Sequence, residues 1–179
     1  MLSGLKNPIL PAVAGTILAL DQISKSWVVA HMSFGESREV ASWLAPLFSL
    51  TYVTNTGIVF GLFQGMGDVL LIVVLIAISA IFLYYRHLPS GPIPLHIALG
   101  LQMGGALGNL VDRLVRGAVV DFIDLNFWPL HHWPIFNLAD ASIVAGVVLL
   151  LLVMLTEKDR QPASAPEEGR GLEGPEAAE

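Results

Sequence analysis

Hydrophobic residues are concentrated in four long stretches of the chain, which are separated by more polar segments. The stretches cover about residues 8–32, 68–85, 93–115 and 137–155. Each is close to the ~20 residues that an α-helix needs to cross the hydrocarbon core of a bilayer. The first stretch is too long for the apolar part of a cleaved signal peptide, so we interpret it as a retained helix. The pattern predicts an all-α membrane protein with four transmembrane helices.

The composition agrees with this interpretation. Of the 179 residues, 54% are hydrophobic and only 13% are charged, whereas a soluble domain has about 25% charged residues. The four helices would use nearly all of residues 1–156, so we expect one membrane domain there. Residues 157–179 hold seven acids against three bases and supply −4 of the net charge of −6. We expect this tail to be disordered and cytoplasmic, because such a composition cannot bury a core.

The distribution of charge also bears on orientation and partners. Five Lys and Arg residues flank the predicted helices on the side of the two termini and three flank the other side. The positive-inside rule then favours cytoplasmic termini and places residues 33–67 and 116–136 outside. No basic patch indicates nucleic acid. Cysteine is absent, which excludes disulfides and a cysteine nucleophile.

The two outer connections differ in composition. Residues 47–54, LFSLTYVT, are rich in β-branched and aromatic side chains and predict a short strand pair or curl. The second connection contains His131 and His132 beside two tryptophans. Adjacent histidines do not share a face in a helix or strand, and we find no third ligand at a suitable spacing. We therefore predict no metal site.

The predicted first helix contains a pair of charged residues, and the predicted third helix contains a regular series of glycines. Asp21 and Lys25 are four residues apart, within ion-pair reach on one helix face. A charge within a membrane helix is costly and therefore needs an explanation. The two residues could neutralise each other as an ion pair, or they could act directly on the substrate, and the sequence allows both interpretations. Gly100, Gly104 and Gly108 recur every four residues. They predict close approach of another helix.

Further polar residues follow this glycine stripe. Asn109, Asp112 and Arg113 share a face near the outer end of the third helix. A salt-bridged helix end, in which Arg113 reaches the interface while pairing with Asp112, and a functional network are equally compatible with this spacing. Neither interpretation leaves these side chains facing lipid.

Asp121 and Asp140 are the candidate catalytic residues. Taken singly, each has a structural explanation, because Asp121 follows the third helix and Asp140 would stabilise the dipole of a helix capped by Asn137. Antiparallel packing of the third and fourth helices would bring the two carboxyls together. Such a pair shares a proton, so one member acts as general base and the other as general acid. We therefore predict an aspartic peptidase that needs no cofactor.

A small proton- or ion-coupled transporter is the alternative. Asp21, Lys25 and Arg113 would also suit a proton relay across a membrane. However, the ionisable residues gather toward one face of the predicted bundle, and no second charged cluster continues to the other side. The peptidase is therefore the leading hypothesis.

Five short motifs resemble, in order, those of the bacterial lipoprotein signal peptidases, the type II signal peptidase family. They are DQISK at 21–25, NTGIVFG at 55–61, GGALGNLVDR at 104–113, GAVVDFID at 117–124 and FNLAD at 136–140. Any one motif is weak, but five in this order and spacing are specific. They span most of the chain outside the tail.

The resemblance implies four transmembrane helices with a small outer-face β-like cradle and a short interfacial helix. It also implies cleavage of diacylglyceryl-modified prolipoproteins just before the lipidated cysteine, at the outer face of the bacterial cytoplasmic (inner) membrane. Lipid-modified precursors and membrane lipids would be the partners, and we expect a monomer. The family usually has small residues where this chain has Ile58 and Val59, so the shape of the cradle is expected to differ.

The resemblance also assigns site residues. The family's catalytic aspartates fall on Asp121 and Asp140. Its other polar site residues, expected to position the lipid, the peptide backbone and the catalytic pair, fall on Asp21, Lys25, Asn55, Asn109, Asp112, Arg113 and Asn137.

Overall fold

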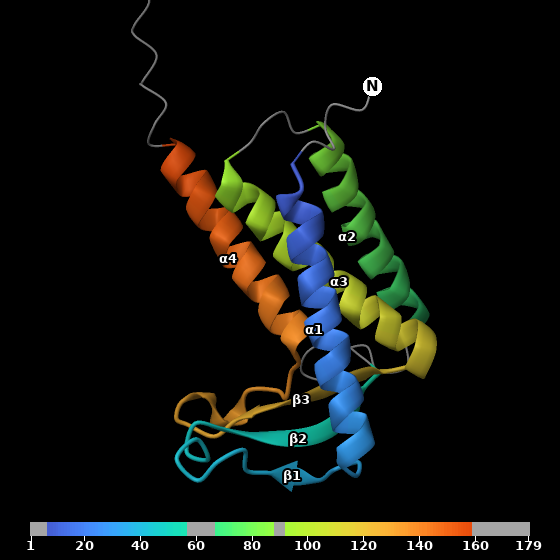
Figure 1. Cartoon of the computed structure of the whole chain (residues 1–179), viewed down its shortest axis with the longest axis vertical. Coiled ribbons are helices and arrows are strands. Elements are labelled where there is room, and N and C mark those ends of the chain that lie inside the picture. Colours follow the sequence, from blue (N-terminus) through green and yellow to red (C-terminus); the bar gives the residue numbers. More distant parts are fainter. Residues whose placement is uncertain (1–6, 57–66, 88–91, 159–179) are drawn as a thin grey trace, which may run out of the picture.

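Four long helices and a small sheet make up the computed structural model, which describes residues 7–56, 67–87 and 92–158. In chain order the elements are α1 (Ile9–His31), β1 (Ser37–Arg38), β2 (Phe48–Asn55), α2 (Gly67–His87), α3 (Ile93–Arg116), β3 (Val119–Leu125), the 3-10 turn η3 (Leu130–His132) and α4 (Leu138–Lys158). The helices form a bundle, and the sheet lies across one end of it (Figure 1). The tail is predicted to be disordered from residue 157, but Glu157 and Lys158 belong to α4. Residues 159–179, and Ile58 and Val59, lie outside the described ranges.

The four predicted stretches all form helices, each with ends within a few residues of the expected ones. They contain 21 to 24 residues, so each is about 31–36 Å long. By length and hydropathy alone, one stretch of the described helices is apolar enough to cross a membrane, namely Leu138–Thr156 with a mean hydropathy of 2.6. Ile72–Tyr85 is a shorter apolar stretch. The charged and polar residues of α1 and α3 reduce the apolar character of those two helices.

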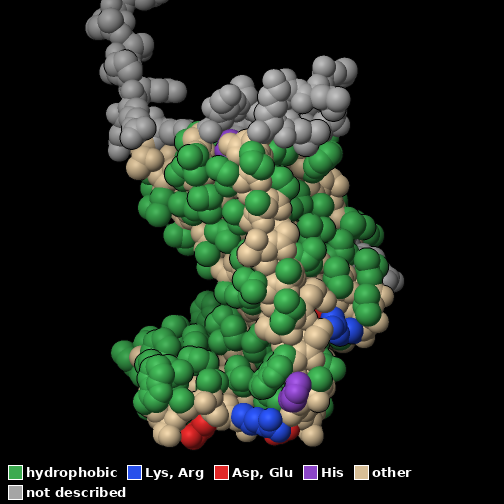
Figure 2. All heavy atoms as spheres, in the orientation of Figure 1, with side chains coloured by type: hydrophobic (Ala, Val, Ile, Leu, Met, Phe, Trp, Pro, Cys, Tyr) green, Lys and Arg blue, Asp and Glu red, His purple; other side chains and the backbone are tan. Residues whose placement is uncertain are grey.

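Hydrophobic side chains also cover the outside of the bundle. Figure 2 shows them along the length of the helices, whereas the visible Lys, Arg, Asp and Glu side chains lie toward the sheet end. The exposed apolar residues include Ile23, Ile76 and Leu155, each more than 60% exposed. A helix that is hydrophobic on its outer surface is typical of a membrane environment rather than of water.

Helix α3 lies at the centre of the bundle and packs against α1, α2 and α4. The predicted close approach at its glycine stripe is confirmed on the α1 side. A Cβ added at Gly100 would lie 2.8 Å from Val13 Cβ, and one at Gly104 would lie 2.7 Å from the Ala14 carbonyl oxygen. Gly105 faces α4 in the same way, where an added Cβ would clash with the backbone oxygen of Ala139. Larger side chains would therefore push the helices apart.

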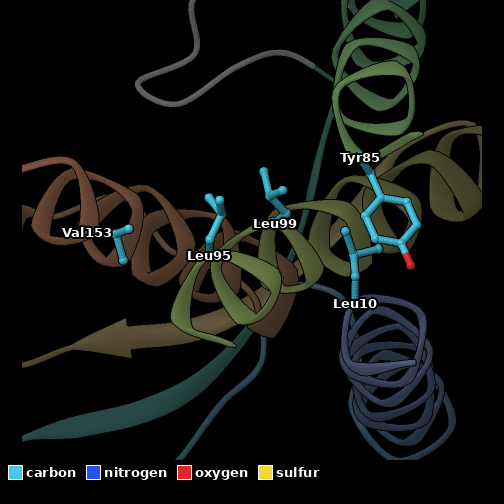
Figure 3. Close-up of a cluster of buried hydrophobic side chains, with 5 residues drawn as sticks. All are labelled: Leu10, Tyr85, Leu95, Leu99 and Val153. Carbon is cyan, nitrogen blue, oxygen red and sulfur yellow. The ribbon is translucent and has the colours of Figure 1, made fainter. Parts of the chain in front are cut away.

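An apolar cluster joins all four helices at the end of the bundle remote from the sheet. Tyr85 of α2 lies over α1 and α3, and its hydroxyl donates a hydrogen bond of 2.8 Å to the Asn7 carbonyl oxygen. Figure 3 shows the members of the cluster, Leu10, Tyr85, Leu95, Leu99 and Val153.

The sheet has the order β1-β2-β3, and both pairings are antiparallel. The segment predicted as a strand pair or curl is instead a single strand, β2, whose partners lie elsewhere in the chain. Residues 119–125 form its partner β3, which the sequence pattern did not predict. Gly117 adopts φ 75° and ends α3, so that the chain turns directly into β3. The sheet packs on the end of α1 through a second cluster, Val28, Met32, Val120 and Phe122.

Candidate active site

Asn137 links the two candidate catalytic aspartates. Asp121 lies within β3 and Asp140 is the third residue of α4. The Asn137 side-chain amide Nδ2 donates a hydrogen bond of 2.6 Å to Asp121 Oδ1. Asn137 and Asp140 also exchange hydrogen bonds, from the Asp140 backbone N–H to Asn137 Oδ1 (2.9 Å) and from the Asn137 backbone N–H to Asp140 Oδ2 (3.3 Å). The predicted N-cap is therefore confirmed, and the same residue bridges to Asp121.

Two further amides orient the carboxylates. Asn109 Nδ2 donates to Asp140 Oδ1 at 2.8 Å, and Asn55 Nδ2 donates to Asp121 Oδ2 at 3.1 Å. The Asn109 oxygen accepts from Lys25 Nζ at 2.9 Å. Because an ammonium group can only donate, Lys25 holds the Asn109 oxygen toward itself and turns the amide nitrogen toward Asp140.

A buried charge network lies behind these amides. Lys25 Nζ is 2.8 Å from Asp21 Oδ2 and 3.0 Å from Asp112 Oδ2, and all three side chains are fully buried. The predicted pairing of Asp21 with Lys25 is thus confirmed. Arg116 also pairs with Asp112 and donates to Gln22 Oε1 at 3.1 Å. The sequence interpretation missed this role of Arg116, although its spacing of four residues from Asp112 is the usual signal of a helical ion pair.

The two carboxylates of this network also hold the backbone beside the candidate catalytic residues. Asp21 Oδ1 accepts from the backbone N–H of Ala139 at 3.0 Å, and Asp112 Oδ2 accepts from that of Val120 at 3.1 Å. Ala139 directly precedes Asp140 and Val120 directly precedes Asp121. Lys25 bridges both carboxylates and therefore connects the start of α4 to β3. Charge-assisted hydrogen bonds of this kind are stronger than neutral ones.

The aspartates line a cavity of about 870 Å³ between α2, α3, α4 and the segment that leads into α4. Its polar end contains Asn55, Asn109, Arg113, Asp121 and Asp140, and most of its remaining lining is apolar. The other four predicted site residues do not line this cavity. They form the buried layer behind it, and they are Asp21, Lys25, Asp112 and Asn137.

The electrostatic setting favours proton exchange at Asp121. Burial raises the pKa of its carboxyl from 3.8 to about 7, and repulsion by Asp140 acts in the same direction. Hydrogen bonds from Asn55 and Asn137 and the charge of Lys25 oppose the shift. A carboxyl that titrates near neutral pH beside a second carboxyl is suited to general acid and base chemistry. Within the described residues, no group of three or more His, Cys, Asp or Glu side chains is arranged to hold a metal ion.

Comparisons with known proteins point to a single family. The family model described as signal peptidase (SPase) II matches residues 13–156. The chain is 42% identical over 149 residues to the lipoprotein signal peptidase of Syntrophomonas wolfei. This alignment covers 83% of this chain and 94% of the relative. The lipoprotein signal peptidase of Moorella thermoacetica is also 42% identical over 149 residues, covering 82% of this chain and 94% of the relative.

Solved structures agree with the sequence relatives. One, described as a bacterial membrane enzyme, superposes with a TM-score of 0.79 at 28% identity and covers 91% of this chain and 98% of its own. A second with the same description has a TM-score of 0.75 at 29% identity and covers 88% and 99%. These matches do not favour the alternative of a transporter. The chain belongs to the signal peptidase II family.

Proposed function

We propose that this protein is an aspartic endopeptidase that removes signal peptides from diacylglyceryl-modified prolipoproteins by cleavage before the lipidated cysteine. The observation that carries the proposal is the pairing of Asp121 and Asp140 through Asn137 at the polar end of an otherwise apolar cavity. The relatives named lipoprotein signal peptidase supply the substrate class.

The proposed chemistry uses the two carboxyls and a water molecule. One carboxylate takes a proton from water, whose oxygen forms a bond to the carbonyl carbon of the scissile peptide. The other, protonated, carboxyl donates its proton to the peptide nitrogen as the carbon–nitrogen bond breaks. Asn55, Asn109 and Asn137 donate hydrogen bonds that hold both carboxyls in place. The two aspartates titrate as a coupled pair, so the roles belong to the pair.

The cavity suits a substrate with an apolar body and a polar cleavage site. Its polar end would hold the scissile peptide, with Arg113 beside the aspartates. Its apolar remainder, between α2, α3 and α4, would hold the acyl chains and the signal segment, whose apolar groups would pack against the apolar lining. Asp21, Lys25 and Asp112 would act as positioning residues from behind the cavity.

The membrane arrangement is part of the same proposal. Residues 1–156 would form one domain with all four helices spanning the bacterial cytoplasmic membrane, both termini and the acidic tail in the cytoplasm, and a monomer as the working unit. The apolar outer surface and the helix lengths support this arrangement. The sheet end of the bundle, which carries the aspartates, would then lie near the outer face.

The direct test is the cleavage of a diacylglyceryl-modified precursor by the purified variants Asp121→Asn and Asp140→Asn. Both should lose cleavage, because neither retains the pair of carboxyls that shares a proton, while both should still insert and fold. Asp124→Asn is the matched control, since Asp124 lies on the same strand but outside the cavity, where it accepts a hydrogen bond from Thr51. Full turnover by either Asp121→Asn or Asp140→Asn would refute the mechanism.

A further inference from the structure

One polar side chain stands apart in the apolar part of the cavity. Gln102 lines it together with Ala106, Asn109 and Arg113, which share one face of α3. The lining also includes apolar residues of α2 and α4, such as Val73 and Val144. Gln102 lies seven positions before Asn109, so it is about 10 Å along the helix axis from the polar end.

The amide nitrogen of Gln102 is not satisfied by any residue that the structure describes. Its Nε2 atom is buried and, among the described residues, has no hydrogen-bond partner. A buried amide that lacks a partner in an apolar setting costs free energy, so such groups are rare. The stem of the side chain packs closely on α4, because a Cβ at Gly146 would lie 2.7 Å from Gln102 Cγ. With its stem held, the amide retains rotation about its last bond and can turn its nitrogen toward a bound molecule.

We propose that Gln102 is a substrate-binding residue whose amide donates a hydrogen bond to a carbonyl oxygen of the substrate. This inference rests on the proposed function, because a diacylglyceryl-modified precursor carries two kinds of carbonyl into the cavity. These are the esters of the lipid and the backbone carbonyls of the signal segment. In the apolar part of the cavity either kind of carbonyl oxygen has no water to bind, so a hydrogen bond from a donor in the protein stabilises it.

The distance along α3 fits the ester. From the scissile nitrogen to the carbonyl oxygen of the nearer ester there are about eight bonds, through the cysteine side chain and the glycerol, which is on the order of 10 Å when extended. With the scissile peptide at the aspartates, an ester carbonyl can therefore reach the level of Gln102. A backbone carbonyl of the signal segment has the same chemistry, so the experiment must distinguish the two.

The test compares Gln102→Met with the wild type on a synthetic precursor peptide bearing a diacylglyceryl cysteine, in detergent micelles. Met keeps the length and the apolar stem but removes the donor. We expect KM to rise about five- to tenfold with kcat within about twofold, the effect of losing one hydrogen bond made equally in the ground and transition states. Leu101→Met is the matched control, since Leu101 directly precedes Gln102 on α3 and does not line the cavity.

A second substrate, identical except that ether linkages replace both esters, identifies the carbonyl. If the ester is bound, Gln102→Met should show its KM defect on the ester substrate and none on the ether substrate. A KM defect of equal size on both substrates would support a backbone carbonyl of the signal segment instead.

Other results would overturn the inference. An unchanged KM on both substrates, or a loss of kcat with KM unchanged, would show that Gln102 binds no substrate carbonyl, while wild-type cleavage would leave the proposed function intact. Failure of the wild type to cleave would refute the proposed function itself. The unfolding midpoint of Gln102→Met should equal or exceed that of the wild type, because an unpaired buried donor has been removed. A lower midpoint would identify a structural role and contradict the binding role.

Discussion

Replacing Asp121 by Asn should make the protein more stable at alkaline pH and less stable at acidic pH. The pKa of Asp121 is raised from 3.8 to about 7 by burial and by repulsion from Asp140. Below about pH 4 the carboxyl is protonated in both the folded and the unfolded chain, so it contributes no penalty. As the pH rises from about 4 to 7, the unfolded chain ionises first. The free energy of unfolding therefore falls over this range and is constant above it.

The magnitude follows from the size of the shift. About three pKa units correspond to a penalty of ~4 kcal/mol above pH 7. The neutral amide of Asn removes this penalty. It cannot accept both hydrogen bonds that Asn55 and Asn137 donate to the two carboxylate oxygens, which costs about 1 kcal/mol. The variant should therefore be more stable than the wild type by ~3 kcal/mol at pH 8 and less stable by ~1 kcal/mol at pH 4.

Denaturant unfolding in detergent micelles, followed at pH 4, 6 and 8, measures both values. For each protein, the free energy of unfolding at pH 4 is the reference from which its change with pH is measured. The stability difference between the variant and the wild type should change sign between pH 4 and pH 8. A difference that stays constant over this range would refute a raised pKa at Asp121.

Three further outcomes follow from the same contacts. Lys25→Met should lower the free energy of unfolding by ~3–5 kcal/mol and abolish cleavage, because it leaves Asp21 and Asp112 buried without their shared cation; a variant as stable as the wild type would contradict this. Gly104→Ala should destabilise the protein by roughly 1–3 kcal/mol, since its Cβ would lie 2.7 Å from a backbone oxygen of α1. In Gly15→Ala, where a Cβ meets nothing within 4 Å, stability should instead rise by ~1 kcal/mol, and equal effects at both glycines would argue against close helix packing. The kcat/KM of precursor cleavage should fall about tenfold per pH unit above pH 7, as the pair loses its shared proton, and a flat profile to pH 9 would exclude that role for the proton.

Local sequence patterns determined the elements whose causes are local. The four helices follow from long apolar stretches, and their ends lie within a few residues of the expected ones. The ion pair of Asp21 with Lys25 and the Asn137 cap depend on spacings of three or four residues, which a helix converts directly into contact. The glycine stripe likewise predicts that another helix packs closely against α3, although it does not identify that helix.

Only the tertiary structure decided how these elements combine into a site. Strand β3 depends on pairing with β2, about seventy residues earlier, so its own sequence contains too little signal. The bond from Ala139 N–H to Asp21 joins residues 118 positions apart, and the cavity needs α2, α3 and α4 together. The sequence could therefore nominate Asp121 and Asp140, but the hydrogen bonds that connect them through Asn137, and the network that holds them in place, exist only after long-range packing. Periodicity describes one element at a time, whereas the site is formed between elements.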